Sequence, residues 1–486
     1  MNMMRAKIAR MGDGAPPRVL DLFAGCGGIS LGFRRAGFDI VGAVELDPQA
    51  ADSHAQNFFR GESKDLIELH GRARDITRTD PHVFIRELGI AGPADAAIDV
   101  IVGGPPCQAF ARVGRAKLRE IADHPQAFRR DPRSNLYLQY IEYVKALRPV
   151  ALLMENVPDV LNFAGHNIAE EMCETLAALG YQCAYTLLNA VFYGVPEMRE
   201  RVFLVALHES LQSRPQFPVP THRAQLPRGY ESSRRVALKT VCSDLLGSTL
   251  AYVPPPSAKG AVLERAVTAL EAVGDLPPIT AHLRGEMPRG TRRFNRLVPY
   301  PSVPVLSPFA HEMRTWPGFE GNGGVMDHVT RSLPRDYRIF RRMKPGDQYP
   351  EAHRHALALL NARLARLRRS GQRIAEGSCR YLELQRSIVP PYDPGKFPNK
   401  WRKMEPDLPA RTLMAHLGKD TYSHIHYDSR QARTITVREA ARLQSFPDGF
   451  RFAGTMNPAF RQIGNAVPPK LAFHIAACML RSLRGD

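Results

Sequence analysis

Cysteine is scarce in this sequence, and the few cysteines form no recognisable pattern. Seven are scattered over 486 residues, an odd number that does not resemble a disulfide framework. No pair has zinc-finger spacing, and Cys173 and Cys183 stand too far apart to be a ligand pair, so both fit buried core thiols better. These absences argue against a disulfide-stapled secreted protein, and we expect no metal site.

Long hydrophobic runs are also missing. No stretch approaches the roughly 20 apolar residues that cross a membrane. Residues 1–17 carry basic side chains but no apolar core of signal-peptide length, so we interpret them as a flexible N-terminus. We therefore expect a protein of a reducing, cytoplasmic compartment that has no membrane partner.

Positive charge, in contrast, is abundant. The chain has 66 Lys and Arg against 48 Asp and Glu, which gives a formal net charge of +18. A surplus of this size favours a polyanionic partner, because each neutralised phosphate releases a counterion. Charge alone leaves open a basic protein with no nucleic-acid partner. The chain is long enough, at 44% hydrophobic residues, to bury a sizeable core in more than one domain.

Apolar strand-like runs alternate with amphipathic helical stretches from Arg18 to about Leu207. This alternation predicts an α/β domain with a doubly wound, mostly parallel sheet that helices cover on both faces. Ligands bind beyond the carboxyl ends of the strands in such sheets. The expected strands are Val19–Phe23, Ile40–Leu46, Asp99–Val102, Ala151–Met154 and Val202–Leu207, with a further strand ending near Asp75, and the expected helices are Ile29–Ala36, Leu136–Leu147 and Ile168–Leu179.

Residues 210–430 are rich in Pro and Arg and show no repeat or regular alternation. The exception is Arg354–Arg369, where leucines recur at helical spacing opposite arginines, and here we favour a solvated surface helix over a DNA-contacting one. Regularity returns at Thr434, and Thr436 with Glu439 forms a capping box that predicts a helix to about Ser445. A last helix is expected over Lys470–Leu483. These changes divide the chain into residues 1–17, 18–209, 210–430 and 431–486.

The first motif is DLFAGCGGIS, which runs from Asp21 to Ser30 at the end of the first strand. Its glycines allow a sharp turn and a close approach to a ligand. A dinucleotide, a nucleoside cofactor or no ligand at all is compatible with this turn, although the spacing is not the full dinucleotide fingerprint. Glu45 ends the second strand, where a carboxylate can accept both ribose hydroxyls. Asp75 and Ile76 are placed to meet an adenine edge, but a capping role would be the default for Asp75 by itself.

The second motif is GGPPCQAFARVG, Gly103 to Gly114, which directly follows a strand. An intracellular cysteine is usually a buried, inert thiol. Pro105 and Pro106 hold the backbone rigidly here, and Cys107 stands at a strand end rather than within the core. This position is suited to a nucleophile.

Two further motifs place polar groups at strand ends. Glu155 begins Glu-Asn-Val, and beside a cysteine from the neighbouring strand it could act as an acid toward a ring nitrogen instead of being a surface residue. Arg199 and Arg201 precede a strand in PEMRERVFLVA. Such alternating arginines commonly face solvent, but in a cleft they could donate to a base carbonyl or a phosphate.

Set in this order, the motifs resemble the C5-cytosine-specific DNA methyltransferase family of the bacterial restriction-modification type. The Asp-x-Phe-x-Gly-x-Gly-Gly loop, Pro-Cys-Gln, Glu-Asn-Val and Arg-x-Arg occur in family order, and RTITVREAARLQSFPD and RQIGNAVPP complete the set. They cover residues 18–207 and 430–486, about half of the chain. The combination is highly specific, although no single motif is.

The resemblance implies the fold of the S-adenosylmethionine-dependent methyltransferases, with a catalytic domain formed by residues 18–209 and 431–486 and an irregular target-recognition domain over 210–430. It implies that a methyl group passes from S-adenosyl-L-methionine to C5 of a cytosine flipped out of double-stranded DNA, through a covalent bond from Cys107 to C6. Glu155 would engage cytosine N3 and Arg201 the O2 carbonyl, with Arg199 in support. The implied cofactor-binding residues are Phe23, Ala24, Gly25, Cys26, Gly27, Gly28, Glu45, Leu46, Asp75, Ile76, Pro106, Leu136, Asn465 and Val467.

The resemblance further implies a monomer on DNA in the bacterial cytoplasm, either paired with a cognate restriction endonuclease or acting as an orphan methylase. Two departures from the family pattern, Glu197 in place of Gln and Ala111 in place of Ser, could weaken phosphate or loop contacts. A tRNA cytosine-5 methyltransferase on the same scaffold is the nearest alternative. The other RNA-specific families carry a second cysteine where this chain has Glu155, a catalytically dead DNA-binding regulator would have lost Cys107 or Glu155, and an oxidoreductase would not explain these residues together.

Overall fold

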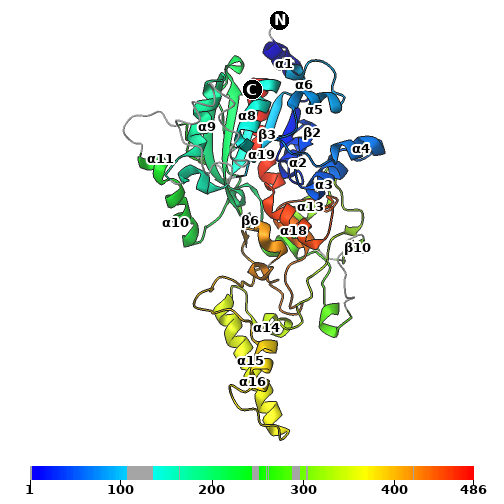
Figure 1. Cartoon of the computed structure of the whole chain (residues 1–486), viewed down its shortest axis with the longest axis vertical. Helices are drawn as coiled ribbons and strands as arrows, with labels where there is room; N and C mark the ends of the chain where they lie inside the picture. Colours follow the sequence, from blue (N-terminus) through cyan, green and yellow to red (C-terminus); the bar gives the residue numbers. More distant parts are fainter. Residues whose placement is uncertain are drawn as a thin grey trace.

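The computed structural model describes residues 3–106, 135–163, 165–243, 251–258, 260, 262–286, 296–302, 305–419 and 421–485. Cys107 and Ala111 lie outside the described residues, so the expectations for them stay predictions. A six-stranded sheet and its covering helices form the upper part of the molecule in Figure 1, and a helical arm extends from the opposite end.

The central sheet has the strand order β2-β1-β3-β4-β7-β5. β2, β1, β3 and β4 are parallel to their neighbours, whereas β7 is antiparallel to both β4 and β5. This confirms the predicted mostly parallel sheet. The strands are β1 Arg18–Leu22, β2 Asp39–Val44, β3 Val100–Gly103, β4 Ala151–Asn156, β5 Tyr181–Asn189 and β7 Glu200–His208.

Helices cover both faces of the sheet. Successive residues of a strand point to opposite faces, and apolar residues on each face form a core with the helices there. Val19 belongs to the core formed with α2 and α19, and the next residue, Leu20, belongs to the core formed with α8 and α9. The sheet is therefore doubly wound, and its central strands β1, β3 and β4 are apolar over most of their length. The covering helices are α2 Gly28–Arg35, α8 Asn135–Leu147, α9 Ile168–Ala177 and α19 Pro469–Arg484, accompanied by α1 Met3–Gly12, α3 Pro48–Phe58, α4 Lys64–His70, α5 Pro81–Glu87 and α6 Ala94–Ala97.

Two sequence-based expectations about strands were wrong. No strand ends at Asp75, because the Asp75 side chain accepts a hydrogen bond from the backbone N–H of Thr77 (2.9 Å) and turns the chain there. The Arg74 N–H still reaches the Glu45 carbonyl (2.7 Å), so Asp75 lies beside the end of β2 without belonging to the sheet. The edge strand β5 was not predicted; its run YQCAYTLLN shows no clear alternation because both of its faces are covered along most of its length.

The C-terminal segment returns to the sheet through three helices, α17 Val437–Leu443, α18 Met456–Asn465 and α19. The predicted capping box is present: the Glu439 N–H donates to Thr436 Oγ1 (3.0 Å), and the Thr436 N–H donates to Glu439 Oε2 (2.8 Å). α17 ends at Leu443, two residues earlier than predicted, because Ser445 adopts a positive φ of 62°. α19 then packs against α2 on one face of the sheet (Figure 1).

The chain between β7 and α17 is irregular. Its longest helix, α15, and its neighbour α16 have a small core of their own around Tyr349, Trp401 and Phe340. The two form the arm that projects from the lower end of the molecule in Figure 1. The helices are α10 Arg228–Ala237, α11 Lys239–Ser243, α12 Ala269–Val273, α13 Pro308–Arg314, α14 Tyr337–Arg342, α15 Tyr349–Arg369 and α16 Cys379–Ile388, and the short strand pairs are β6 Glu197–Met198 with β12 Ala410–Arg411, β8 His222–Arg223 with β9 Glu264–Arg265 and β10 Val298–Pro299 with β11 Gly324–Val325.

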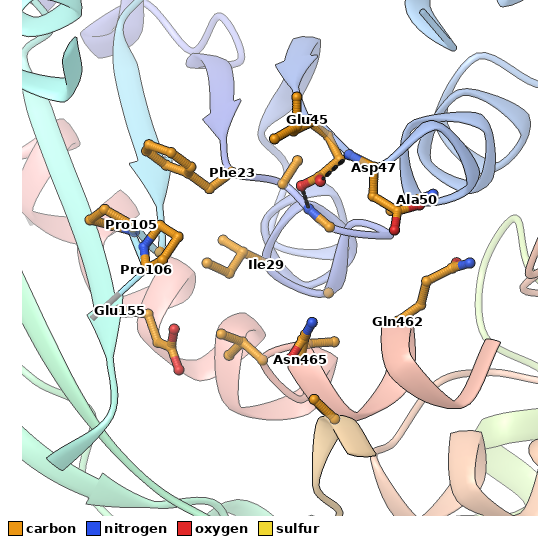
Figure 2. A pocket seen from close by; sticks show the side chains of 18 of the residues that line it. Phe23, Ile29, Glu45, Asp47, Ala50, Pro105, Pro106, Glu155, Gln462 and Asn465 are labelled. Carbon is orange, nitrogen blue, oxygen red and sulfur yellow. Dashed lines mark hydrogen bonds between the residues drawn. The ribbon is translucent and has the colours of Figure 1, made fainter. Parts of the chain in front are cut away.

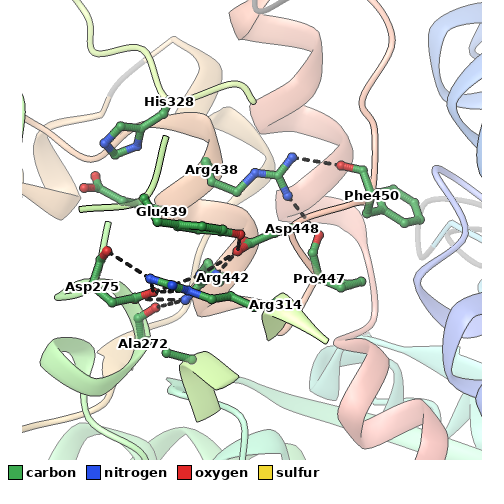
Figure 3. Close-up of polar contacts among 12 residues, drawn as sticks. Ala272, Asp275, Arg314, His328, Arg438, Glu439, Arg442, Pro447, Asp448 and Phe450 are labelled. Carbon is green, nitrogen blue, oxygen red and sulfur yellow. Dashed lines mark hydrogen bonds and ion pairs between the residues drawn. The ribbon is translucent and has the colours of Figure 1, made fainter. Parts of the chain in front are cut away.

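A buried ionic network joins α17 to this irregular region (Figure 3). Arg442 donates to both carboxylate oxygens of Asp448 (2.6 Å each) and also to Asp275 (3.1 Å), which in turn pairs with Arg314 (2.7 Å). Burial by itself would raise the pKa of the Asp448 carboxyl, but Arg442 lowers it below its ordinary value. Each charge in the network therefore depends on its partners, since an unpaired buried charge is costly.

We expect Asp448→Asn to lower the free energy of unfolding by about 3 kcal/mol or more. Arg442 would stay buried and charged but would lose the carboxylate that accepts two of its hydrogen bonds. Chemical denaturation of the purified variant measures this. Glu286→Gln, which breaks an exposed pair with Arg284, is the matched control and should leave stability nearly unchanged. Equal stabilities of the two variants would show that the network does not hold the regions together.

Candidate active site

A cavity of about 540 Å³ opens beyond the carboxyl ends of β1 to β4 (Figure 2), which is the position predicted from the alternation of strands and helices. Its wall combines residues from the start and the end of the chain. The predicted site residues found there are Phe23, Ala24, Gly25, Gly28, Glu45, Leu46, Asp75, Ile76, Pro106, Leu136, Glu155, Arg199, Arg201, Asn465 and Val467. Cys26 and Gly27 are not part of this wall.

The loop after β1 is held in an unusual backbone conformation. Phe23 and Gly25 have positive φ values of 59° and 57°, and Gly27 has a φ of 96°. A Cβ at Gly27 would lie 2.3 Å from the ring of Phe58, and one at Gly28 would lie 2.2 Å from the Val467 carbonyl oxygen. Only glycine fits at these two positions, and the loop is thereby packed directly against the C-terminal segment.

Cys26 turns away from the cavity. Its Sγ is fully buried and lies 3.8 Å from the carbonyl oxygen of Gln462. Burial raises the pKa of this thiol far above its ordinary value. Cys26 is therefore a packing residue of the loop and is not suited to nucleophilic chemistry, which needs the thiolate.

Glu45 organises one end of the cavity (Figure 2). Its two carboxylate oxygens accept hydrogen bonds from the backbone N–H groups of Gly25 and Asp47, each at 2.8 Å. Burial raises the pKa of this carboxyl, and the two N–H donors partly offset that effect. Each oxygen retains a second lone pair that can accept a hydroxyl donor from the cavity.

Sequence reasoning missed Asp47, which lies at the same end. Its Oδ1 caps α3 by accepting from the Gln49 N–H (2.9 Å), and its Oδ2 forms an ion pair with Arg461 of α18. The pair Asp47-Pro48, an N-cap residue before a first-turn proline, was a local signal for this helix start. No local sequence signal indicates that Asp47 contacts α18, because Arg461 is distant from it in the sequence.

Three buried polar groups lie behind the loop and were also missed. Ser30 Oγ donates to Asp21 Oδ2 (2.5 Å) and lies 3.1 Å from His54 Nε2. Burial raises the pKa of Asp21 to about 7 and lowers that of His54 to about 3. These three side chains hold the start of α2 behind the loop, and none of them lines the cavity.

Glu155 and Arg201 face each other at the opposite end of the cavity, with Arg201 Nε 3.0 Å from Glu155 Oε1. Burial raises the pKa of the Glu155 carboxyl, and Arg201 and Arg199 partly counter this. Asn156 fixes the adjacent loop by donating from Nδ2 to the Pro105 carbonyl (2.8 Å). The end of β4 thus brings an acid, a guanidinium and the Pro105-Pro106 turn together.

Arg199 is buried and joins three segments. Its guanidinium donates to the carbonyl oxygens of Leu413 and Gly464, both at 3.0 Å. The N–H of Leu413 donates in turn to Glu197 Oε1 (2.6 Å). Leu413 is thus held at both backbone groups, and the adjoining Met414 lines the cavity. Glu197, which stands where the family often has Gln, therefore makes a contact within the chain. Its second carboxylate oxygen has no hydrogen-bond partner among the described residues.

Membrane and metal features are absent from the described residues. None of the helices there is long and apolar enough to cross a bilayer. No three His, Cys, Asp or Glu side chains in that part of the chain cluster in a way that could hold a metal ion.

Comparison with known proteins reveals matches along most of the chain. The family model described as C-5 cytosine-specific DNA methylase matches residues 17–268 and 337–481. The provisionally named type II methyltransferase M.OihORF3336P of Oceanobacillus iheyensis is 38% identical over 474 residues, which is 96% of each protein. The type II methyltransferase M.AgeI of Thalassovita gelatinovora is 30% identical over 475 residues, 93% of this chain and 97% of that protein.

A solved structure shares the fold. A provisionally named DNA modification methyltransferase encoded within an E. coli prophage superposes with a TM-score of 0.58 and is 22% identical in sequence. The match covers 95% of this chain and 98% of that one. At this identity the likeness shows the common fold.

The buried carboxyl of Glu197 should make the stability of the protein depend on pH. Burial raises its pKa from 4.5 to about 7, so the folded state holds this proton more tightly than the unfolded state does. The resulting stabilisation is complete below about pH 4.5 and is lost as the pH rises to about 7. Glu197→Gln has no such proton to lose, so its stability relative to wild type should rise across this window, by up to about 3 kcal/mol.

Urea unfolding at a series of pH values measures this difference. Glu68→Gln, which removes an exposed carboxyl on α4, is the matched control. A stability difference between Glu197→Gln and wild type that stays constant from pH 4.5 to 7.5 would contradict the raised pKa.

Proposed function

The chain belongs to the C-5 cytosine-specific DNA methylase family, and we propose that it methylates C5 of a specific cytosine in double-stranded DNA with S-adenosylmethionine as donor. The observation that carries the proposal is that the same cavity contains Glu45 at one end and the Glu155–Arg201 pair at the other. One end suits a nucleoside cofactor and the other a polar base. A methyl donor and its acceptor can therefore meet between them.

The cavity residues fit S-adenosylmethionine. A volume of about 540 Å³ is within the range of small-molecule sites. Glu45 can accept ribose hydroxyls, Asp75 can accept from an adenine edge, and Phe23 and Ile76 supply apolar surface for the ring. Gly25 faces open space, since a Cβ there would meet no atom within 4 Å, and this leaves room for the methionine part. When bound, the cofactor supplies the electrophilic methyl group that C5 accepts.

Glu155 and Arg201 are proposed to hold the cytosine. Because its pKa is raised by burial, Glu155 can keep a proton and donate a hydrogen bond to N3. Arg201, which contacts Glu155, would donate to the O2 carbonyl. Both interactions strengthen as negative charge develops on the ring during nucleophilic addition, and this is the condition for lowering the barrier.

Cys107 is proposed as the nucleophile. It follows Pro106, whose turn lines the cavity near Glu155. The thiolate forms a bond to C6, and the electron pair of the C5–C6 double bond makes C5 electron-rich. After C5 is methylated, a base removes the C5 proton, the double bond re-forms and the thiolate leaves. The cytosine must flip out of the duplex first, since C6 is inaccessible in stacked DNA.

Arg199 is proposed to support the site indirectly. Its guanidinium is occupied by the carbonyls of Leu413 and Gly464, so it positions the cavity wall and does not contact the base. Residues 210–430 are proposed to select the DNA sequence, because both flanking parts supply the cavity and this part supplies few of its residues. The type II names of the relatives favour a role with a cognate restriction endonuclease on the same site.

We expect Glu45→Ala to weaken binding of S-adenosylmethionine by about 1.5–3 kcal/mol, through the loss of charged hydrogen bonds to the ribose. Calorimetry on the purified variant measures the affinity. Glu68→Ala, on the exposed side of α4, is the control and should bind as the wild type does. Unchanged affinity in Glu45→Ala would exclude the ribose role.

DNA that carries 5-fluorocytosine tests the nucleophile. Fluorine cannot leave as a proton, so the wild type should stay attached to this DNA through denaturation when the cofactor is present. Cys107→Ser should lose nearly all methylation and all trapping, because a hydroxyl is far less ionised than a thiol at neutral pH. Cys379→Ser, which changes an exposed cysteine, is the matched control and should trap DNA normally. An adduct mapped to any other cysteine would overturn this mechanism.

A further inference from the structure

The helical arm formed by α15 and α16 is not used by the proposed reaction. It extends away from the sheet at the lower end of the molecule (Figure 1), and none of its residues lines the cavity. Its buried side chains belong to the base of the arm, where Tyr349, Ala352, Ala356 and Leu360 join the small core around Trp401. No residue of α15 beyond Leu360 is buried. The outer half of α15 contributes only the partly buried Leu364 to this core.

The outer half of the arm carries a dense positive charge. Arg363, Arg366 and Arg369 recur every three residues, and residues at this spacing are neighbours on one flank of a helix. Arg368 and Arg373 add to them, and no acidic residue occurs between Ala352 and Arg373. All five guanidinium groups belong to exposed residues, and no ion pair within the described residues involves them. These five arginines are called the arm arginines below.

Stabilisation of the helix explains only part of this charge. A cation in the last turn interacts favourably with the helix dipole, by a few tenths to about 1 kcal/mol. The arm arginines exceed what one helix end requires, and neighbours of like charge on one flank destabilise it. Leu364 packs against the small core at the base of the arm, so covering its apolar surface does not require the arginines either.

The sequence pattern by itself favours a solvated surface helix here; from the position and charge of the arm we propose instead that the arm arginines bind the phosphate backbone of DNA outside the sequence that is methylated. This inference rests on the proposed function, because that function brings a DNA duplex to the chain. A helix of 21 residues is about 31 Å long, which corresponds to about nine base pairs of B-DNA. The arm is thus long enough to reach phosphates beyond a short recognition site. Phosphate contacts of this kind add affinity and fix position without reading sequence.

The test uses a triple variant, Arg363→Gln, Arg366→Gln and Arg369→Gln, because glutamine keeps the helix propensity. The DNA probes are duplexes of about 14 and about 40 base pairs, both centred on a cytosine that the wild type methylates in plasmid DNA. On the long duplex, the slope of log affinity against log salt concentration should become shallower by about 2–3, since each lost phosphate contact removes about 0.9. On the short duplex, affinity and methylation rate should match those of the wild type.

A second triple variant controls for charge. Arg5→Gln, Arg72→Gln and Arg86→Gln remove three exposed arginines from the part of the molecule around α1, α4 and α5, far from the arm in Figure 1. This control should keep the wild-type slope on the long duplex. An arm variant with the wild-type slope there, or with equal losses on both duplexes, would overturn the proposal. Methylation of plasmid DNA by the wild type is measured first, so failure of the proposed function is seen separately.

Discussion

The cavity depends on one buried guanidinium. Arg199, directly before β7, donates to the carbonyl oxygens of Leu413 and Gly464, which lie 214 and 265 residues further along the chain. Burial lowers the pKa of this side chain to about 10, and the nearby Glu197 and Glu155 favour its charged form. These hydrogen bonds hold the backbone next to Met414 and Asn465, which line the cavity. The N-terminal part of the chain and the returning C-terminal segment thereby share one cavity wall.

The two ends of the cavity use buried carboxyls in different ways. At one end, backbone N–H donors hold Glu45, and this leaves its carboxylate ready to accept hydroxyls. At the other end, Arg201 pairs with Glu155, and burial raises the pKa of the Glu155 carboxyl while Arg201 and Arg199 partly counter this. The same residue type is thus held by backbone N–H groups at one end and by guanidinium groups at the other. In the proposed function, this difference separates the cofactor end of the cavity from the base end.

Much of the fold and of the site could be predicted from the sequence, because the signals were local. Apolar runs such as Val19–Phe23 indicated the central strands, and the Thr436–Glu439 capping box fixed the start of α17. The contacts that connect distant segments had no such signal: Asp47 with Arg461, Arg442 with Asp275, and Arg199 with Leu413. Asp75 was placed at a strand end because its hydrogen bond to Thr77 could not be anticipated.

Transfer of a labelled methyl group tests the central claim most directly. The purified chain is incubated with S-adenosylmethionine labelled on its methyl carbon and, in separate reactions, with plasmid DNA and with tRNA. We expect the label to enter DNA and to be recovered as 5-methylcytosine, and we expect tRNA to stay unlabelled. Label in tRNA, or in DNA on an exocyclic amine instead of C5, would contradict this claim.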